Sequence, residues 1–138
     1  MTLADDIARE LPFLRRQAES LMLDRGTMRR ANGGTTQDPD SGTTVPTYDD
    51  LFTSNAKIQT RNLQARESEV GGRTSTSVRV ELHLPVSAPA VETGDVWEVT
   101  RVNALSDVQL LGRKFRVIAP VGKSFATARR LEVEEIVS

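Results

Sequence analysis

The sequence lacks cysteine entirely and contains a single histidine, His83. The absence of cysteine excludes a disulfide framework and thiolate metal sites, and it fits a cytosolic product. His83 lies on the polar phase of an alternating segment, so a metal site there would need carboxylates alone around it. We interpret His83 as a surface residue, and we expect neither a metal ion nor another cofactor.

Long apolar runs and aromatic residues are also scarce. No stretch approaches the roughly 20 apolar residues that span a bilayer. The acidic N-terminus, MTLADDIARELPF, lacks the apolar run of a signal peptide, so we expect a soluble intracellular product. With 38% hydrophobic residues, one Trp, one Tyr and four Phe, the 138 residues predict a single domain with a small core.

The usual signatures of catalysis are missing. The stretches GGRTSTS and VGKSF do not have the GxxxxGK[ST] spacing of a phosphate loop, and no GxSxG nucleophile motif occurs. The segment DPDSG lacks the later ligands of a calcium loop. Neighbouring carboxylates such as Asp49 and Asp50 do not by themselves form an acid–base pair. The sequence therefore predicts no catalytic residues and no enzymatic activity.

Neither sign of charge predominates. The 18 Lys and Arg residues stand against 19 Asp and Glu residues, which gives a net charge of -1. A domain that binds nucleic acid by neutralising phosphates is usually basic or carries a dense basic stripe. Alternating signs along every segment instead favour a solvated surface or contacts between subunits.

One convincing helical period is present, near the N-terminus. Its apolar residues recur every three or four positions: Leu3, Ile7, Leu11, Leu14, Ala18, Leu21 and Met22. They predict an amphipathic helix that packs on its own domain or docks onto a partner. Pro12 either kinks this helix or opens a second one. We divide the chain into an N-terminal helical segment, residues 1–24, and a β domain, residues 25–138.

Six short strands follow without intervening helices. The clearest is TSVRVELHLP, whose alternating apolar residues predict a half-buried antiparallel strand. The others are TMRRA, NAKIQTR, DVWEVTRV, RKFRVIAPV and ARRLEVEEIV. The predicted fold is mainly β, a small antiparallel β-barrel or sandwich of about six strands with an N-terminal α-helix and long loops. Its predicted core residues are Val80, Leu82, Trp97, Phe115 and Val117.

Two polar segments are predicted as long loops, residues 32–47 and 62–75. The first consists almost wholly of turn formers, so we expect a loop or an arm that a partner orders. The second carries a Gly71-Gly72 pair, which permits the backbone angles of a hinge.

The aromatic residues leave an alternative open. Trp97 and Phe115, flanked by Arg101 and Lys114, are compatible with an OB-like barrel that stacks the bases of a nucleic acid. Alternatively, both rings fill the core. We favour the core, because each ring lies in a strand with apolar residues close by.

Several short motifs follow one another in a characteristic order. They are Tyr48 before the A-x-I-Q strand of residues 56–59, Gly94-Asp95 before a strand, D-x-x-L-x-G-R-x-F-R-V at 107–117, and an Arg-rich last strand from Ala128 to Leu131. This plan, over residues 14–135, resembles the head-closure proteins, or head-to-tail stoppers, of long-tailed siphophages. The helix LRRQAESLM, residues 14–22, resembles the opening helix of the actinobacteriophage type.

The resemblance implies a structural virion protein of the phage neck, made in the host cytoplasm. It implies a homo-oligomeric ring, a hexamer, with the portal and its adaptor above and the tail terminator or tail tube below. The ring would hold packaged double-stranded DNA in its channel without sequence specificity. A tail terminator or tail-completion protein is the near alternative, and an OB-like nucleic-acid-binding module is the distant one.

The resemblance also implies one loop per subunit that points into the channel. We assign this role to the loop 62–75, which follows the second strand as in the family. Its candidate plug residues are Arg66, Glu67, Glu69, Gly71, Gly72 and Arg73. The loop 32–47 is then expected to contact an adjacent subunit or ring.

Overall fold

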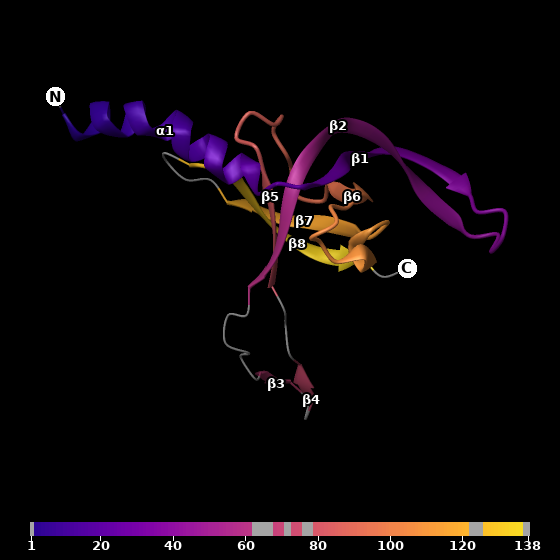
Figure 1. Ribbon diagram of the computed structural model, residues 1–138. Coiled ribbons are helices and arrows are strands. Elements are labelled where there is room, and N and C mark those ends of the chain that lie inside the picture. Colours follow the sequence, from indigo (N-terminus) through magenta and orange to yellow (C-terminus); the bar gives the residue numbers. More distant parts are fainter. Residues whose placement is uncertain (1, 62–67, 71–72, 76–78, 122–125, 137–138) are drawn as a thin grey trace.

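The computed structural model of the protein describes residues 2–61, 68–70, 73–75, 79–121 and 126–136 (Figure 1). In chain order its elements are α1 (Leu3–Ser20), β1 (Asp24–Gln37), β2 (Thr44–Arg61), β3 (Ser68–Val70), β4 (Arg73–Ser75), β5 (Arg79–Leu84), β6 (Val96–Arg101), the 3₁₀ turn η1 (Val108–Leu110), β7 (Lys114–Val121) and β8 (Arg129–Ile136).

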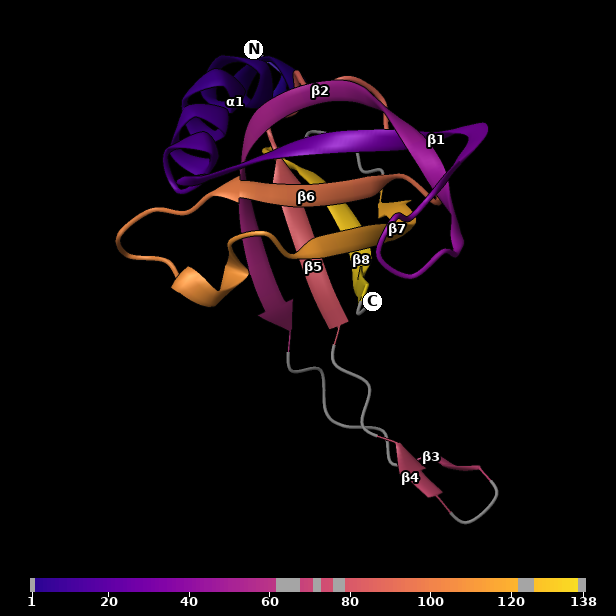
Figure 2. The ribbon, with the colours of Figure 1, turned by 90° about the vertical axis from the view of Figure 1, so that its right-hand side faces the viewer.

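Six of the strands form one closed sheet. Their order around it is β1, β2, β5, β8, β7 and β6, and β6 pairs back onto β1. All of these pairings are antiparallel, and Figure 2 shows β1, β6 and β7 crossing in front of β5 and β8. The structure confirms the predicted mainly β fold with an N-terminal helix.

The core fills the inside of the closed sheet. Its inward residues alternate along four strands: Leu82 and Leu84, Trp97 and Val99, Phe115 and Val117, and Leu131 and Val133. Met28 from β1 completes the cluster beside Trp97, its partner in the β1–β6 register. Among the residues expected in the core, Val80 lies at the margin and packs against the cluster while half-buried.

Helix α1 is a single helix that continues through Pro12 and ends at Ser20, before the predicted end of the helical segment. A capping box begins it, because the Thr2 hydroxyl accepts from the Asp5 amide while the Asp5 carboxylate accepts from the Thr2 amide. Met22, which the helical period placed on the apolar stripe, is instead buried in the connection to β1.

The structure corrects the prediction of a loop over residues 32–47. Residues 32–37 continue β1, residues 44–47 begin β2, and only residues 38–43 form a turn. The turn is closed by backbone hydrogen bonds between Asp38 and Thr43 and between Gly42 and Asp38, each 2.8 Å long. A sheet ladder is made by backbone groups, so Thr, Asn and Gly can form it without contributing apolar side chains to a core.

The expected loop over residues 62–75 is described only in part. Residues 68–70 and 73–75 form strands β3 and β4, which pair with each other in a separate two-stranded sheet. The other residues of that segment lie outside the described residues.

Candidate functional site

The described residues hold no group of three or more His, Cys, Asp or Glu side chains that could bind a metal ion. None of the helices in the described part of the chain is long and apolar enough to cross a membrane. What distinguishes the described surface is a β-hairpin that leaves the closed sheet, together with the charged surfaces around it (Figure 1).

We call this hairpin the ribbon and define it as Ala31–Gln37 with Thr44–Tyr48 and the turn 38–43. β6 pairs with β1 only as far as Arg29, and β5 pairs with β2 only from Lys57 onward. Within the described part of the chain the ribbon therefore pairs only with itself, and almost all of its residues are exposed. Figures 1 and 2 show it projecting beyond β6 and β7.

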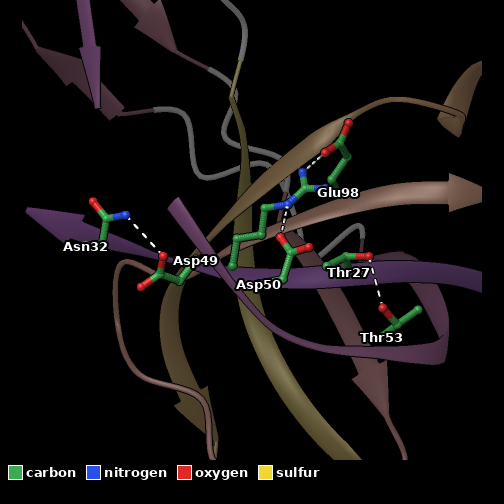
Figure 3. Close-up of polar contacts among 7 residues, drawn as sticks. Thr27, Asn32, Asp49, Asp50, Thr53 and Glu98 are labelled. Atoms are coloured by element: carbon green, nitrogen blue, oxygen red, sulfur yellow. Dashed lines mark hydrogen bonds and ion pairs between the residues drawn. The ribbon is translucent and has the colours of Figure 1, made fainter. Parts of the chain in front are cut away.

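Polar contacts fix the base of the ribbon (Figure 3). The Arg29 guanidinium binds the Asp50 carboxylate, with Nε and Oδ1 2.8 Å apart, and it also contacts the Glu98 carboxylate on β6. Further out, the Asn32 amide donates to Asp49 Oδ1 over 3.1 Å. These contacts cross from β1 to both of its neighbours where the β1–β2 register shifts between Met28 and Arg29, so they set the direction in which the ribbon leaves the sheet.

A second anchor lies on the other side of β1. The Arg30 guanidinium donates to both oxygens of Asp95, over 2.9 and 3.0 Å, and Asp95 is only 2% exposed. The hydrogen bond that Arg30 donates to Asp95 is the main cause that raises the pKa of Arg30. Asp95 also accepts from the Glu92 amide over 2.9 Å, so it ties β1 to the turn that precedes β6. Bidentate pairs of this kind fix geometry as well as charge.

A groove with a volume of about 930 Å³ runs between the ribbon and the outer face of β6, β7 and β8. Val45, Pro46 and Tyr48 of the ribbon form one side, and Val96 and Ile136 lie on the other. Charged residues also line it: Arg29, Asp38, Glu98, Arg113, Lys114 and Glu135. Val96 points outward on β6 yet is 6% exposed, which shows how closely the base of the ribbon covers this face.

The wall formed by β5 and β8 carries a different surface. Lys57, His83 and Arg130 stand side by side on β2, β5 and β8, because the register pairs Lys57 with His83 and His83 with Arg130. We call these three residues the basic row. Gln59, Glu81 and Glu132 form the next row on the same outward phase, so this face carries both signs of charge. His83 Nε2 lies 3.0 Å from Glu81 Oε2.

The interpretation of His83 as an exposed surface residue is corrected, since it is 9% exposed. It does lie on the outward phase of β5, between the inward residues Leu82 and Leu84. Directly opposed side chains in a sheet stand about 5 Å apart at Cβ, so the long stems of Lys57 and Arg130 shield the imidazole from both sides.

The candidate plug residues fall mostly outside the described part of the chain, as Arg66, Glu67, Gly71 and Gly72 do. Glu69 lies on β3 opposite Thr74, and Arg73 lies on β4 opposite Val70. The predicted core residues Trp97 and Phe115 oppose each other in the β6–β7 register and are 1% and 2% exposed. Leu82 and Val117 are fully buried.

Sequence reasoning did not find the Arg30–Asp95 pair or the basic row. The first joins residues 65 positions apart, and the second is assembled from three strands. The Gly94-Asp95 motif did indicate a turn, and Gly94 has a φ of 95°. Nothing in the spacing of the chain indicated that Asp95 would be buried against a guanidinium.

Residues 14–134 match the sequence model of a family described as "Family of unknown function (DUF6093)", and the chain belongs to this family. No curated protein matches the chain. Among solved structures, the chain is similar to the solution structure of protein SF1141 from Shigella flexneri 2a. The two share 18% sequence identity with a TM-score of 0.50, over 81% of this chain and 90% of that chain, so the likeness concerns the fold alone.

Proposed function

We propose that the protein is a structural virion protein of the phage neck, a head-to-tail stopper. Its copies form a ring below the portal and adaptor, close the DNA channel after packaging and present the surface to which the tail attaches. It assembles in the host cytoplasm, remains in the neck of the virion and needs no cofactor.

The observation that carries this proposal is the division of the described chain into a closed sheet and β-ribbons outside it. The closed sheet has a continuous apolar core, whereas the ribbon has no residue in that core. The β3–β4 pair forms a second, separate sheet, drawn apart from the closed sheet in Figures 1 and 2. A stopper requires a rigid scaffold with projections toward neighbouring subunits and the channel, and this division supplies both parts.

We assign the two projections different roles. The segment 62–75, which contains β3 and β4, reaches into the channel as the plug, and its Glu67 and Glu69 repel the phosphates of DNA. The ribbon contacts an adjacent subunit or ring. The near balance of charge over the whole chain fits this function, because a strongly basic wall would hold DNA that has to slide through.

Replacement of residues 65–72 by a short Gly-Ser link tests the plug. The variant should fold and join the neck, because changing the length of a surface loop costs only about 1 kcal/mol or less. Phage carrying it should package a genome and then lose it before or during tail joining, which nuclease protection of DNA in purified heads measures. A matched control replaces the ribbon turn 38–43 by Gly-Ser of equal length. Heads of the 65–72 variant that retain DNA normally would show that this segment is not the plug.

The burial of two rings weighs against the OB-like alternative. Base stacking needs aromatic faces on the surface. Trp97 and Phe115 lie inside the closed sheet, so neither ring offers its face to a base. Titration of the purified protein with single-stranded DNA at low salt should give no saturable binding, and tight binding would favour the alternative.

A further inference from the structure

Helix α1, with its C-cap Leu21, presents an apolar stripe to solvent. The members of the stripe are Leu3, Phe13, Leu14 and Leu21, and they are between 44% and 76% exposed. Leu14 follows Leu3 by 11 residues and precedes Leu21 by 7. These separations are about three and two helical turns, so the three leucines share one side of the helix. We call the four residues the free stripe, and no residue of α1 itself is buried.

A different side of the helix meets its own domain. That side holds Ile7, Leu11 and Ala18, which are half-buried, and Arg15, whose Nε donates to the Ala126 carbonyl oxygen over 3.1 Å. The contact with the rest of the chain therefore leaves the neighbouring free stripe in water. Contiguous apolar surface on an ordered element of a soluble protein indicates an interaction site.

The groove under the ribbon offers a matching surface at the other end of the molecule. It has a volume of about 930 Å³ and apolar residues on both sides, and Val45 and Tyr48 on the ribbon side are 37% and 40% exposed. A two-stranded ribbon needs a third strand or a packed face to be stable. Beyond Arg29 the described structure supplies neither. An amphipathic helix in a groove is a common mode of recognition, and such a helix would give the ribbon the packed face that it lacks.

Most charges of the groove neutralise one another within one copy. The Arg29 guanidinium binds the carboxylates of Asp50 and Glu98. Arg113 Nε lies 3.4 Å from Glu135 Oε1. These four pairing partners leave little net charge for a second molecule to read.

Two charged groups of the groove form no ion pair with another described residue, Lys114 on β7 and Asp38 in the ribbon turn. The Asp38 carboxylate already accepts from the Asp40 amide over 3.0 Å, whereas Lys114 is exposed. In the first half of α1, the exposed Asp6 and Glu10 follow Leu3 by 3 and 7 residues, so they stand beside the free stripe. The available cation of the groove is thus opposite in sign to the charges beside the stripe.

The helix and the groove of one copy cannot meet. Figure 1 shows α1 leaving the closed sheet toward one side, with the N-terminus at its far end, and the ribbon leaving toward the opposite side. The helix leads directly into β1, whose first residues lie in the closed sheet at the end remote from the ribbon. A helix that fills the groove therefore has to come from another molecule.

We propose that the groove of one copy binds helix α1 of a second copy, with the free stripe against the ribbon and the acidic first half of the helix beside Lys114. This inference deepens the proposed function, on which it rests for the biological role of the contact, by naming the two surfaces that join neighbouring subunits. The contact is heterologous, because it joins two different surfaces. Its repetition gives a closed ring when the rotation between copies closes.

Cysteine cross-linking tests the geometry directly, because the natural chain contains no cysteine. One variant carries Gln17→Cys, an exposed helix position between Leu14 and Leu21, and another carries Val45→Cys on the ribbon side of the groove. A short bismaleimide should join a mixture of the two at high protein concentration into dimers containing one of each. A chain carrying both changes should give a ladder of higher oligomers.

Each cysteine has a matched control. Arg16→Cys lies one residue before Gln17 on the polar side of the helix, and Gln59→Cys lies at an exposed position of β2 outside the groove. The inference is overturned if either control replaces its counterpart without loss of the mixed dimer. It is equally overturned if the Gln17 variant joins mainly to itself, because the helices of two copies would then pair with each other.

Removal of apolar anchors gives a second test. Leu14→Ser with Leu21→Ser should lower the yield of the Gln17–Val45 dimer about tenfold or more, because two apolar side chains no longer leave water on binding. Leu105→Ser with Val108→Ser, at residues that are 88% and 71% exposed outside both surfaces, should leave the yield unchanged. Denaturation midpoints should stay at the parental value in both variants. A lowered midpoint in the helix variant would show that the stripe packs within its own copy, which contradicts the inference.

Charge reversal tests the direction of the helix in the groove. Lys114→Glu in the groove or Glu10→Lys in the helix should each lower the yield about fivefold. Mixing the reversed groove with the reversed helix should restore the yield, which a structural defect could not do. Arg101→Glu, at an exposed position of β6 outside the groove, makes the same change in net charge as Lys114→Glu and should have no effect. Failure of the mixture to recover would refute the placement of Glu10 beside Lys114.

Phage assays separate this contact from the proposed function. If the purified variants cross-link as expected but purified necks contain no copies of the protein, the stopper role fails and the contact stands. If necks contain the protein and retain DNA, yet neither the necks nor the purified protein give the Gln17–Val45 cross-link, the contact fails and the stopper role stands.

Discussion

β1 and β2 each have one half in the closed sheet and one half in the ribbon, and the two halves differ in burial. Near the helix, the first residues of β1 are almost all buried, with Met28 fully enclosed beside Trp97. Beyond Arg30 the same strand is exposed at every position. The sheet half rests on a shared apolar core, whereas the ribbon half rests on one hydrogen-bonded ladder and a few polar contacts. One strand thus belongs both to the scaffold and to the ribbon, which we propose as a contact surface.

Trp97→Ala should have the largest effect on stability, and this effect should concern only the half of the molecule in the closed sheet. Truncation of a fully buried Trp costs roughly 3–5 kcal/mol in free energy of unfolding, because the lost apolar contacts leave a cavity. Chemical denaturation followed by circular dichroism measures this cost. A variant that unfolds at the parental denaturant concentration would show that the core does not depend on this ring.

The same substitution, Gly to Ala, can be made in both halves of β1, at Gly26 in the closed sheet and at Gly34 in the ribbon. A Cβ at Gly26 would lie 2.5 Å from the Glu98 backbone oxygen and from the Trp97 ring, neither of which can move freely. A Cβ at Gly34 would lie 2.8 Å from the Thr47 hydroxyl and 2.9 Å from the Asn32 side chain, which can turn aside. We expect Gly26→Ala to cost about 1–3 kcal/mol or more by overpacking, and Gly34→Ala distinctly less. Equal midpoints in denaturant would contradict this difference.

Removal of the ribbon should change stability little and association greatly. Replacing residues 33–46 by an Asn-Gly turn leaves Asn32 and Thr47 joined by a tight hairpin and removes no core residue. The free energy of unfolding should change by about 1 kcal/mol or less. The shortened protein should associate with other copies less than the parent does, which sedimentation velocity of both proteins measures. A large loss of stability would mean that the ribbon supports the closed sheet.

The smallest effect concerns the first turn of α1, remote from the core. Hydrogen bonds from the Thr2 amide and hydroxyl lower the pKa of Asp5 below 3.8. The pKa of Asp5 is lower in the folded than in the unfolded protein. The cap therefore stabilises the helix in full above the unfolded pKa of Asp5, and this stabilisation is lost as the pH falls through the folded pKa. Amide chemical shifts of the first turn should therefore show a transition whose midpoint lies below the usual pKa of an aspartate. Asp5→Asn should remove that transition and leave the unfolding of the closed sheet unchanged.

The sequence predicted the structure correctly where apolar residues alternate with polar ones. Leu82, Trp97, Phe115 and Val117 could be predicted as core because each alternates with polar residues along a strand. The ribbon could not be predicted as strand, because its Thr, Asn and Gly residues show no alternation.

Contacts between residues far apart in the sequence could not be predicted either. Asp95 is buried where Arg30 of β1 pairs with its carboxylate. His83 is shielded because Lys57 and Arg130 lie beside it on the neighbouring strands.

The sequence by itself determined that this is a mainly β protein with one N-terminal helix, because apolar residues with a period of two and of about 3.6 require sheet and helix to bury them. Only the tertiary structure decided that the strands close into one sheet, that β1 and β2 continue outside it, and that Arg30 meets Asp95. The physical reason is that strand order and register are set by backbone pairing between distant segments, and these pairings leave no local pattern in the chain.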